Sequence, residues 1–95
     1  MNERIMTMHP QGKQGVRIDR AKYDAIREAI IAVLREVGEA TFGDLTAAVR
    51  GRLAGCFDGS VSWYVTTVKL DLEARGEIER VPGSRPQRLR LAAEE

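Results

Sequence analysis

The sequence has little of three things that would point to a special environment: cysteine, long apolar runs and an excess of one charge. Its single cysteine, Cys56, cannot form an internal disulfide bond, so nothing indicates an oxidising compartment. No apolar run approaches the roughly 18 residues of a membrane-spanning helix, and residues 1–4 lack the apolar segment of a signal peptide. We therefore expect a cytoplasmic protein with no membrane partner.

The net charge is close to zero. Fifteen Lys and Arg residues against 14 Asp and Glu residues leave +1, whereas domains dedicated to nucleic acids are usually distinctly basic. The arginines are unevenly placed, however, because residues 80–93 hold four of them and no acid. Any binding of nucleic acid must therefore depend on that local cluster.

A catalytic or metal-binding pattern is also missing. His9 is the only histidine and Cys56 the only cysteine, and no acidic cluster surrounds either of them at ligand spacing. Residues 9–15 contain two glycines but lack the spacing of a phosphate-binding loop. We predict no enzyme, no metal site, no cofactor and no small-molecule ligand.

What the sequence does contain is a series of amphipathic helices. The first begins after Asp19, whose carboxylate can accept from free backbone amides, and ends at Gly38, which readily adopts the left-handed conformation. Inside it, apolar residues recur at steps of three and four, which indicates one buried stripe. They are Tyr23, Ile26, Ile30, Val33, Leu34 and Val37.

The second helix follows a short segment, residues 39–41. Thr41 is suited to cap it, and Asp44 favours its positive start. An apolar face then follows at Leu45, Val49 and Leu53. The connection to the next helix, residues 54–59, is longer than the tight turn of a minimal helix-turn-helix.

The third helix begins after Asp58 or Ser60, since either side chain can cap it, and it ends at Arg75-Gly76. A short antiparallel hairpin follows. Leu89 and Leu91 alternate with arginines, which predicts a strand with one apolar and one cationic face. Residues 82–86 contain two prolines and a glycine and mark the turn of the hairpin.

These elements fit one α+β domain with one modest core, given 95 residues of which 43% are hydrophobic. Residues 1–17 show little periodicity and are expected to form an N-terminal arm, disordered alone or extended on a surface. Residues 18–92 form the domain and residues 93–95 a C-terminal tail. The predicted core comprises Tyr23, Ile26, Ile30, Val33, Leu34, Phe42, Leu45, Val49, Leu53, Val61, Val65, Val68, Leu72, Ile78, Leu89 and Leu91.

Residues 19–91 resemble the winged-helix class of bacterial transcriptional regulators. Residues 41–45 (Thr-Phe-Gly-Asp-Leu) and residues 72–80 (Leu-Glu-Ala-Arg-Gly-Glu-Ile-Glu-Arg) carry this resemblance. Residues 62–73 also resemble a family of small bacterial proteins of uncharacterised function. The resemblance implies a three-helix bundle with a small antiparallel β-hairpin wing. It also implies transcription regulation, with DNA read by the exposed face of the third helix and by arginines of the wing.

The first functional hypothesis is therefore a DNA-binding regulatory module. The side of the third helix turned away from the core offers hydroxyl groups and one cation to the major groove of double-stranded DNA. Arginines of the hairpin would hold the phosphate backbone. The residues of this predicted site are Ser62, Thr66, Thr67, Lys69, Arg85, Arg88 and Arg90.

A second hypothesis uses the same scaffold for protein–protein interaction or self-association as a homodimer, without DNA. Its apolar anchors are Trp63, Tyr64 and Leu70, residue types that are common in the centre of interfaces. A third interpretation gives this surface no function, because the arm or the hairpin would bury Trp63 and Leu70.

The wing arginines have two interpretations as well. They contact phosphates, or they pair with Glu77 and Glu79 and keep an exposed hairpin soluble. The DNA hypothesis requires a continuous positive ridge in which the arginines project outward beside the hydroxyl-bearing side of the third helix. That ridge must be neither neutralised by carboxylates nor covered by the N-terminal arm.

Overall fold

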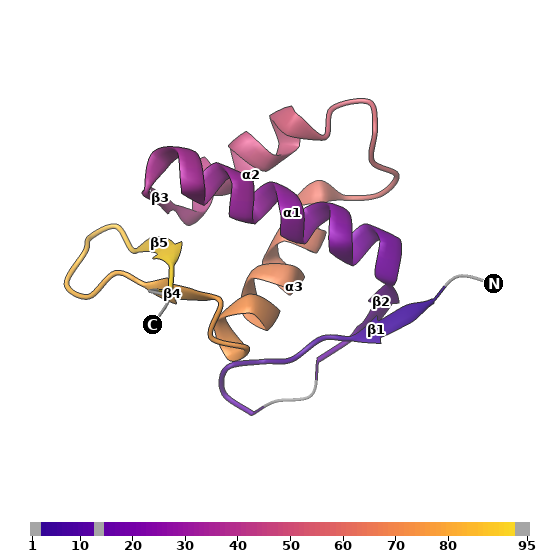
Figure 1. The fold of residues 1–95 in the computed structure, drawn as a ribbon, viewed down its shortest axis with the longest axis horizontal. Helices are drawn as coiled ribbons and strands as arrows, with labels where there is room; N and C mark the ends of the chain where they lie inside the picture. Colours follow the sequence, from indigo (N-terminus) through magenta and orange to yellow (C-terminus); the bar gives the residue numbers. More distant parts are fainter. Residues whose placement is uncertain (1–2, 13–14, 93–95) are drawn as a thin grey trace.

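The computed structural model of the protein describes residues 3–12 and 15–92, and in them it is an α+β fold of three helices and two small antiparallel sheets (Figure 1). The first sheet pairs β1 with β2, and the second contains β3, β4 and β5. The elements in chain order are β1 (Arg4–Met6), β2 (Arg17–Asp19), α1 (Arg20–Val37), β3 (Glu39–Thr41), α2 (Phe42–Arg52), α3 (Val61–Ala74), β4 (Ile78–Arg80) and β5 (Arg88–Leu91).

Each helix begins at a polar side chain that the sequence marks as a cap. Asp19 accepts a hydrogen bond from the amide of Ala21 at 2.9 Å, and Thr41 accepts one from the amide of Asp44 at 3.1 Å. For α3, Ser60 rather than Asp58 is the cap. These bonds satisfy backbone donors that a helix start otherwise leaves unpaired. The predicted helix starts are thus confirmed.

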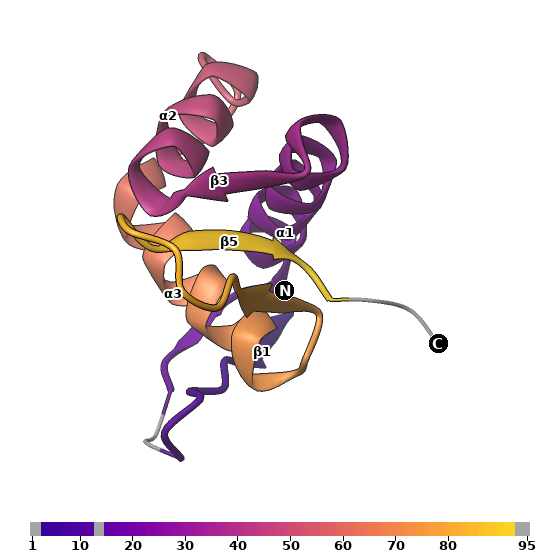
Figure 2. The ribbon, with the colours of Figure 1, turned by 90° about the vertical axis from the view of Figure 1, so that its left-hand side faces the viewer.

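The three-stranded sheet has the order β3-β5-β4 and is antiparallel throughout. Leu89 is at its centre, opposite Ala40 on β3 and Arg80 on β4 (Figure 2). Its side chain is buried, while Arg88 is exposed. The predicted alternation of apolar and cationic side chains along this strand is therefore confirmed.

The core lies between the three helices and the apolar face of this sheet. Among predicted core residues, Leu53, Val61 and Leu91 are half-buried and pack against the core. The prediction for Phe42 is wrong, since its ring is 38% exposed. Ala40 and Leu45, which flank Phe42 in the sequence, are buried in the core. The ring of Phe42 lies outside the core, under the ammonium of Lys69. Three further buried hydrophobic residues that the prediction omitted are Ile18, Ala29 and Ala40.

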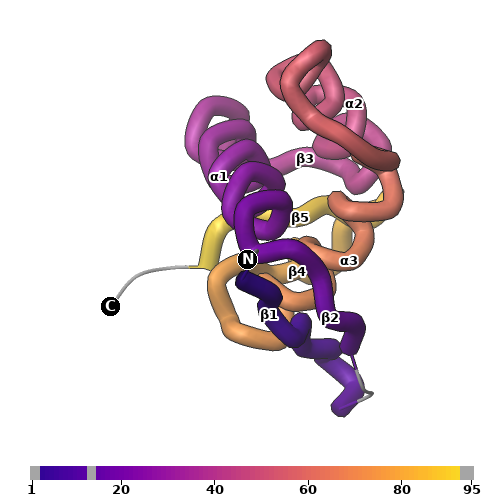
Figure 3. The backbone as a smooth tube through the Cα atoms, turned by 90° about the vertical axis from the view of Figure 1, so that its right-hand side faces the viewer, coloured from indigo at the N-terminus to yellow at the C-terminus, as the bar shows by residue number. Residues whose placement is uncertain are grey.

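The N-terminal segment, expected as an arm either disordered alone or extended on a surface, contains a β-hairpin in its described part. β1 pairs with β2 in antiparallel register, so that Ile5 lies opposite Ile18 below the first turn of α1 (Figure 3). Thr7 extends the pairing, because its amide and hydroxyl both donate to the carbonyl of Val16 at 2.9 Å. Burial of Ile18 in the core anchors this hairpin to the domain. Residues 1–2 and 13–14 of the expected arm and the expected tail, residues 93–95, lie outside the described residues.

No helix within residues 3–12 and 15–92 has the length and apolar character needed to cross a membrane.

Candidate functional site

The side of α3 that faces away from the core contains the residues predicted for binding. Val65, Val68 and Leu72 are fully buried, as expected for the core stripe. On the opposite side, Trp63 is 47% exposed and Thr66 is exposed as well. The remaining predicted residues of this helix, Ser62, Tyr64, Thr67, Lys69 and Leu70, are half-buried.

Trp63 belongs to a small aromatic cluster. Its ring meets Tyr64 edge-on with centroids 4.9 Å apart, and Tyr64 in turn meets Phe57 edge-on at 5.1 Å. The ammonium of Lys22 lies 5.5 Å from the centre of the Tyr64 ring. Edge-to-face contacts of this kind fix the orientation of aromatic rings. Trp63 is therefore an exposed side chain that is held in place from one side.

Two of the hydroxyl groups predicted to face DNA already have partners within the protein. Arg50 of α2 donates to the hydroxyl of Ser62, and the hydroxyl of Thr66 donates to the carbonyl of Ser62 at 2.9 Å. Both oxygens keep the capacity to accept a further bond. These two hydroxyl groups are nevertheless less available for hydrogen bonds to DNA bases than the sequence alone predicted.

Lys69 is not available as a simple phosphate contact. Only 14% of its side chain is exposed, and its ammonium lies 3.3 Å from Glu73 and 5.4 Å from the centre of the Phe42 ring. The guanidinium of Arg80 on β4 contacts the same Glu73 oxygen at 3.2 Å. Glu73 thus forms ion pairs with one cation of α3 and with one cation of β4.

The arginines of the β4–β5 hairpin are partly neutralised. Arg90 pairs with Glu79 at 2.6 Å, and Arg88 lies 3.9 Å from Glu39. Arg85, at the tip of the hairpin, is exposed and forms no ion pair with any described residue. The predicted pairing with Glu79 is therefore present, whereas Glu77 pairs with Arg27 of α1 instead.

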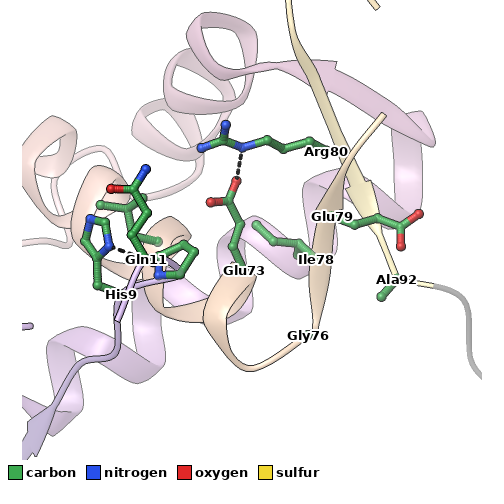
Figure 4. Close-up of a pocket in the computed structure, with 10 residues that line it drawn as sticks. His9, Gln11, Glu73, Gly76, Ile78, Glu79, Arg80 and Ala92 are labelled. Carbon is green, nitrogen blue, oxygen red and sulfur yellow. Dashed lines mark hydrogen bonds and ion pairs between the residues drawn. The ribbon is translucent and has the colours of Figure 1, made fainter. Parts of the chain in front are cut away.

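The N-terminal hairpin reaches the C-terminal half of α3. Residues 9–11, in the loop between β1 and β2, line a cavity of about 480 Å³ together with Leu70, Glu73 and Ile78 (Figure 4). Leu70 therefore does not belong to an open apolar patch with Trp63. Its side of the helix is partly covered by the chain's own N-terminal segment.

Asp71 is a residue that the sequence analysis missed. It is completely buried, and its carboxylate accepts from the hydroxyl of Tyr23, the amide of Met8 and the guanidinium of Arg75. Burial raises the pKa of Tyr23, and the hydrogen bond to Asp71 raises it further. The position of an acid next to Leu72 in the apolar stripe was the available signal. A carboxylate there must be buried with partners.

The described residues contain no group of three or more His, Cys, Asp and Glu side chains that could hold a metal ion. Beside α3 and on the β4–β5 hairpin they present the exposed side chain of Trp63 together with three exposed cations, and among these three only Arg88 has a carboxylate within 4 Å. The cations are Arg50, Arg85 and, at 3.9 Å from Glu39, Arg88.

Comparison with known proteins places the chain in a family. Residues 4–89 match the model of a family of unknown function (DUF6958). The chain belongs to this family. The matched range runs from β1 into β5, so it includes the N-terminal hairpin together with the three helices and most of the β4–β5 hairpin. No curated protein and no solved structure matches the chain.

Proposed function

We propose that this domain is a winged helix that associates with a second copy of itself through the exposed side of α3. The order helix, strand, helix, helix, hairpin and the strand order β3-β5-β4 support the fold assignment. In this arrangement α3 and the β4–β5 hairpin are the parts that meet a partner.

The observation that carries the proposal is the exposure of Trp63. A large aromatic ring that is oriented by Tyr64 yet 47% exposed is costly to leave in water and well suited to the centre of an interface. A net charge of +1 supports association, since two copies repel each other only weakly.

DNA binding is the second candidate function, because ion pairs within the protein neutralise several of the cations that it needs. The DNA hypothesis needed a continuous positive ridge, but Glu73 lies between Lys69 and Arg80, and Glu79 pairs with Arg90. Carboxylates at these places would repel phosphates that approach α3 and the wing together. The exposed cations are therefore separate points instead of a ridge.

The self-association proposal is tested by the fluorescence of Trp63, the only tryptophan of the chain. Raising the protein concentration from micromolar to millimolar should shift its emission to shorter wavelength, because the ring becomes buried against the second copy. Val37→Ala is the matched control. Val37 is also an exposed apolar residue, but it lies at the end of α1, so this variant should show the same shift of the Trp63 emission. Emission that stays constant over the whole series would contradict the proposal.

DNA binding stays as the second candidate because Arg85 and Arg88 remain exposed on the wing and Arg50 lies beside Ser62. Three cations would give a salt dependence of about −3 in log K against log[salt]. A titration of mixed-sequence duplex at low salt should then show weak binding that Arg85→Ala plus Arg88→Ala reduces and Arg35→Ala, on α1, does not. Absence of binding at low salt removes this candidate.

A further inference from the structure

The cavity between the N-terminal hairpin, α3 and β4 has the features of a binding site for a small molecule. Its volume of about 480 Å³ lies in the range of ligand pockets, and its walls come from three separate elements. Pro10, Leu70 and Ile78 give it apolar surface, while His9, Gln11, Glu73 and Arg80 supply polar groups (Figure 4).

Glu73 carries an unsatisfied acceptor at this cavity. Only 7% of its side chain is exposed. One carboxylate oxygen, Oε1, accepts a hydrogen bond from Arg80 and forms an ion pair with Lys69, but the other, Oε2, is buried and has no hydrogen-bond partner among the described residues. Buried carboxylate oxygens without a partner are rare because desolvation is costly. Figure 4 shows this second oxygen turned from Arg80 toward the side of His9 and Gln11.

The charges around Glu73 determine which kind of donor fits. Lys69 and Arg80 already place two positive charges against its single negative charge, and Glu79 is paired with Arg90. A third cation at Oε2 would be repelled by the first two. A neutral N–H group is therefore the donor that suits this oxygen.

Donors for a neighbouring carbonyl group are present as well. Arg80 uses its Nε in the contact with Glu73, which leaves its terminal nitrogens as donors. His9 accepts from the amide of Gln11 through Nδ1, so the neutral ring carries its proton on Nε2. A molecule in which an N–H group lies beside a carbonyl group could therefore donate to Glu73 and accept from Arg80 or His9.

We infer that this cavity binds a small, flat, neutral ring compound that contains a lactam group. The ring N–H donates to Oε2 of Glu73, the carbonyl accepts from Arg80, and the ring rests on Pro10 and Leu70. A partial rotation of the Glu73 carboxylate, whose terminal torsion is soft, brings Oε2 to the cavity surface. The inference is independent of the proposed self-association, since Trp63 does not line the cavity.

The test compares two probes, 2-pyridone and N-methyl-2-pyridone, which differ only at the ring nitrogen, where N–H is replaced by N–CH3. In a titration of isotope-labelled protein followed by NMR, 2-pyridone should shift the amide signals of Leu70, Glu73 and Ile78. N-methyl-2-pyridone should bind at least about tenfold more weakly, because it cannot donate to a charged acceptor. Equal affinity for the two probes, or no shift at these residues with either, would overturn the inference.

A protein variant gives a second test. Glu73→Gln replaces the charged carboxylate with a neutral amide and should reduce the preference for 2-pyridone over its N-methyl analogue, because hydrogen bonds to a charged acceptor are stronger, whereas Glu36→Gln, at the exposed end of α1, should keep it. Because Glu73→Gln also removes two ion pairs, its folding is checked by the same amide spectrum. The comparison of the two probes on the unmodified protein stands without this variant. An unchanged preference in folded Glu73→Gln would contradict the assigned role of Oε2.

Discussion

At the scale of single residues, Asp71 connects three parts of the chain that are far apart in the sequence. Its carboxylate accepts from Tyr23 on α1, from Met8 after β1 and from Arg75 at the end of its own helix. A buried charge with three donors is stable only while the donors remain in place. Two of these partners, Tyr23 and Met8, are 48 and 63 residues away in the sequence, so no local pattern could have predicted them.

Asp71→Ala should lower the free energy of unfolding by about 3 kcal/mol, because it leaves a buried hydroxyl, a buried amide and a guanidinium without their acceptor. Urea denaturation followed by circular dichroism measures this loss. Asp24→Ala is the control, since Asp24 is exposed and its contact with Arg20 at 3.9 Å is weak. Equal stability of the two variants would show that the Asp71 network contributes nothing.

Tyr23 makes the stability of the fold depend on pH in the alkaline range. Burial and the hydrogen bond to Asp71 raise the pKa of Tyr23 above its ordinary value. The unfolded chain releases this proton near pH 10, whereas the folded chain keeps it, so folding is weakened once the pH rises above about 10. Below that pH the contribution of Tyr23 is complete.

The free energy of unfolding should therefore decrease with rising pH above about 10, and more steeply in the unmodified protein than in Tyr23→Phe. Urea denaturation at a series of pH values from neutral to strongly alkaline measures both slopes. Tyr23→Phe also loses a hydrogen bond at every pH, so the slope and not the absolute stability is the quantity to compare. Identical slopes would contradict the assigned state of Tyr23.

At the scale of elements, local signals and long-range contacts differ in what the sequence reveals. The helix starts at Asp19 and Thr41 follow from side chains within three residues of the groups they cap, and the sequence predicts them. The β1–β2 hairpin depends on Ile18 reaching the core and on Met8 reaching Asp71. Those contacts exist only in the folded chain, which is why the segment resembles an arm in the sequence.

Gly15 is the position at which this hairpin tolerates no side chain. A Cβ atom there would lie 1.9 Å from the carbonyl oxygen of Thr7, a backbone atom that cannot move aside cheaply. Gly15→Ala should therefore separate the two chains of the hairpin near Thr7 and Val16. Hydrogen exchange of the Thr7 and Met8 amides should become faster, since both amides are bonded in the hairpin or to Asp71.

Gly51→Ala serves as the control for this prediction. Gly51 lies in α2, and a Cβ atom there meets nothing within 4 Å, so alanine should stabilise the helix by up to about 1 kcal/mol. It should leave the exchange of Thr7 and Met8 unchanged. If the Thr7 and Met8 amides remained protected from exchange in Gly15→Ala, the described contacts of the hairpin would be wrong.

At the scale of the whole molecule, the distribution of charge decides between the two functional hypotheses. The sequence shows where the arginines are, and the alternation in β5 shows that they point outward. The Lys69–Glu73 pair has the i,i+4 spacing of neighbours on one helix, but the sequence does not show that Arg80 of β4 reaches the same carboxylate, because that contact joins two elements. The candidate DNA site was therefore predicted at the level of its residues but not at the level of their pairing.

The exposure of Trp63 belongs to this scale too. Its place on the side of α3 opposite the core stripe follows from helical periodicity alone. Whether the N-terminal segment covers it depends on where the hairpin lies, and the hairpin reaches Leu70 but leaves Trp63 exposed. Self-association through this side of α3 is the central claim of the account.

The most direct test of that claim is the mass of the protein in solution, measured by light scattering from micromolar to millimolar concentration. The account predicts that the weight-average mass rises from 10.6 kDa toward twice that value, and that Trp63→Ala holds it near 10.6 kDa throughout. A mass of 10.6 kDa at every concentration of the unmodified protein, or a rise that Trp63→Ala leaves unaltered, would contradict it.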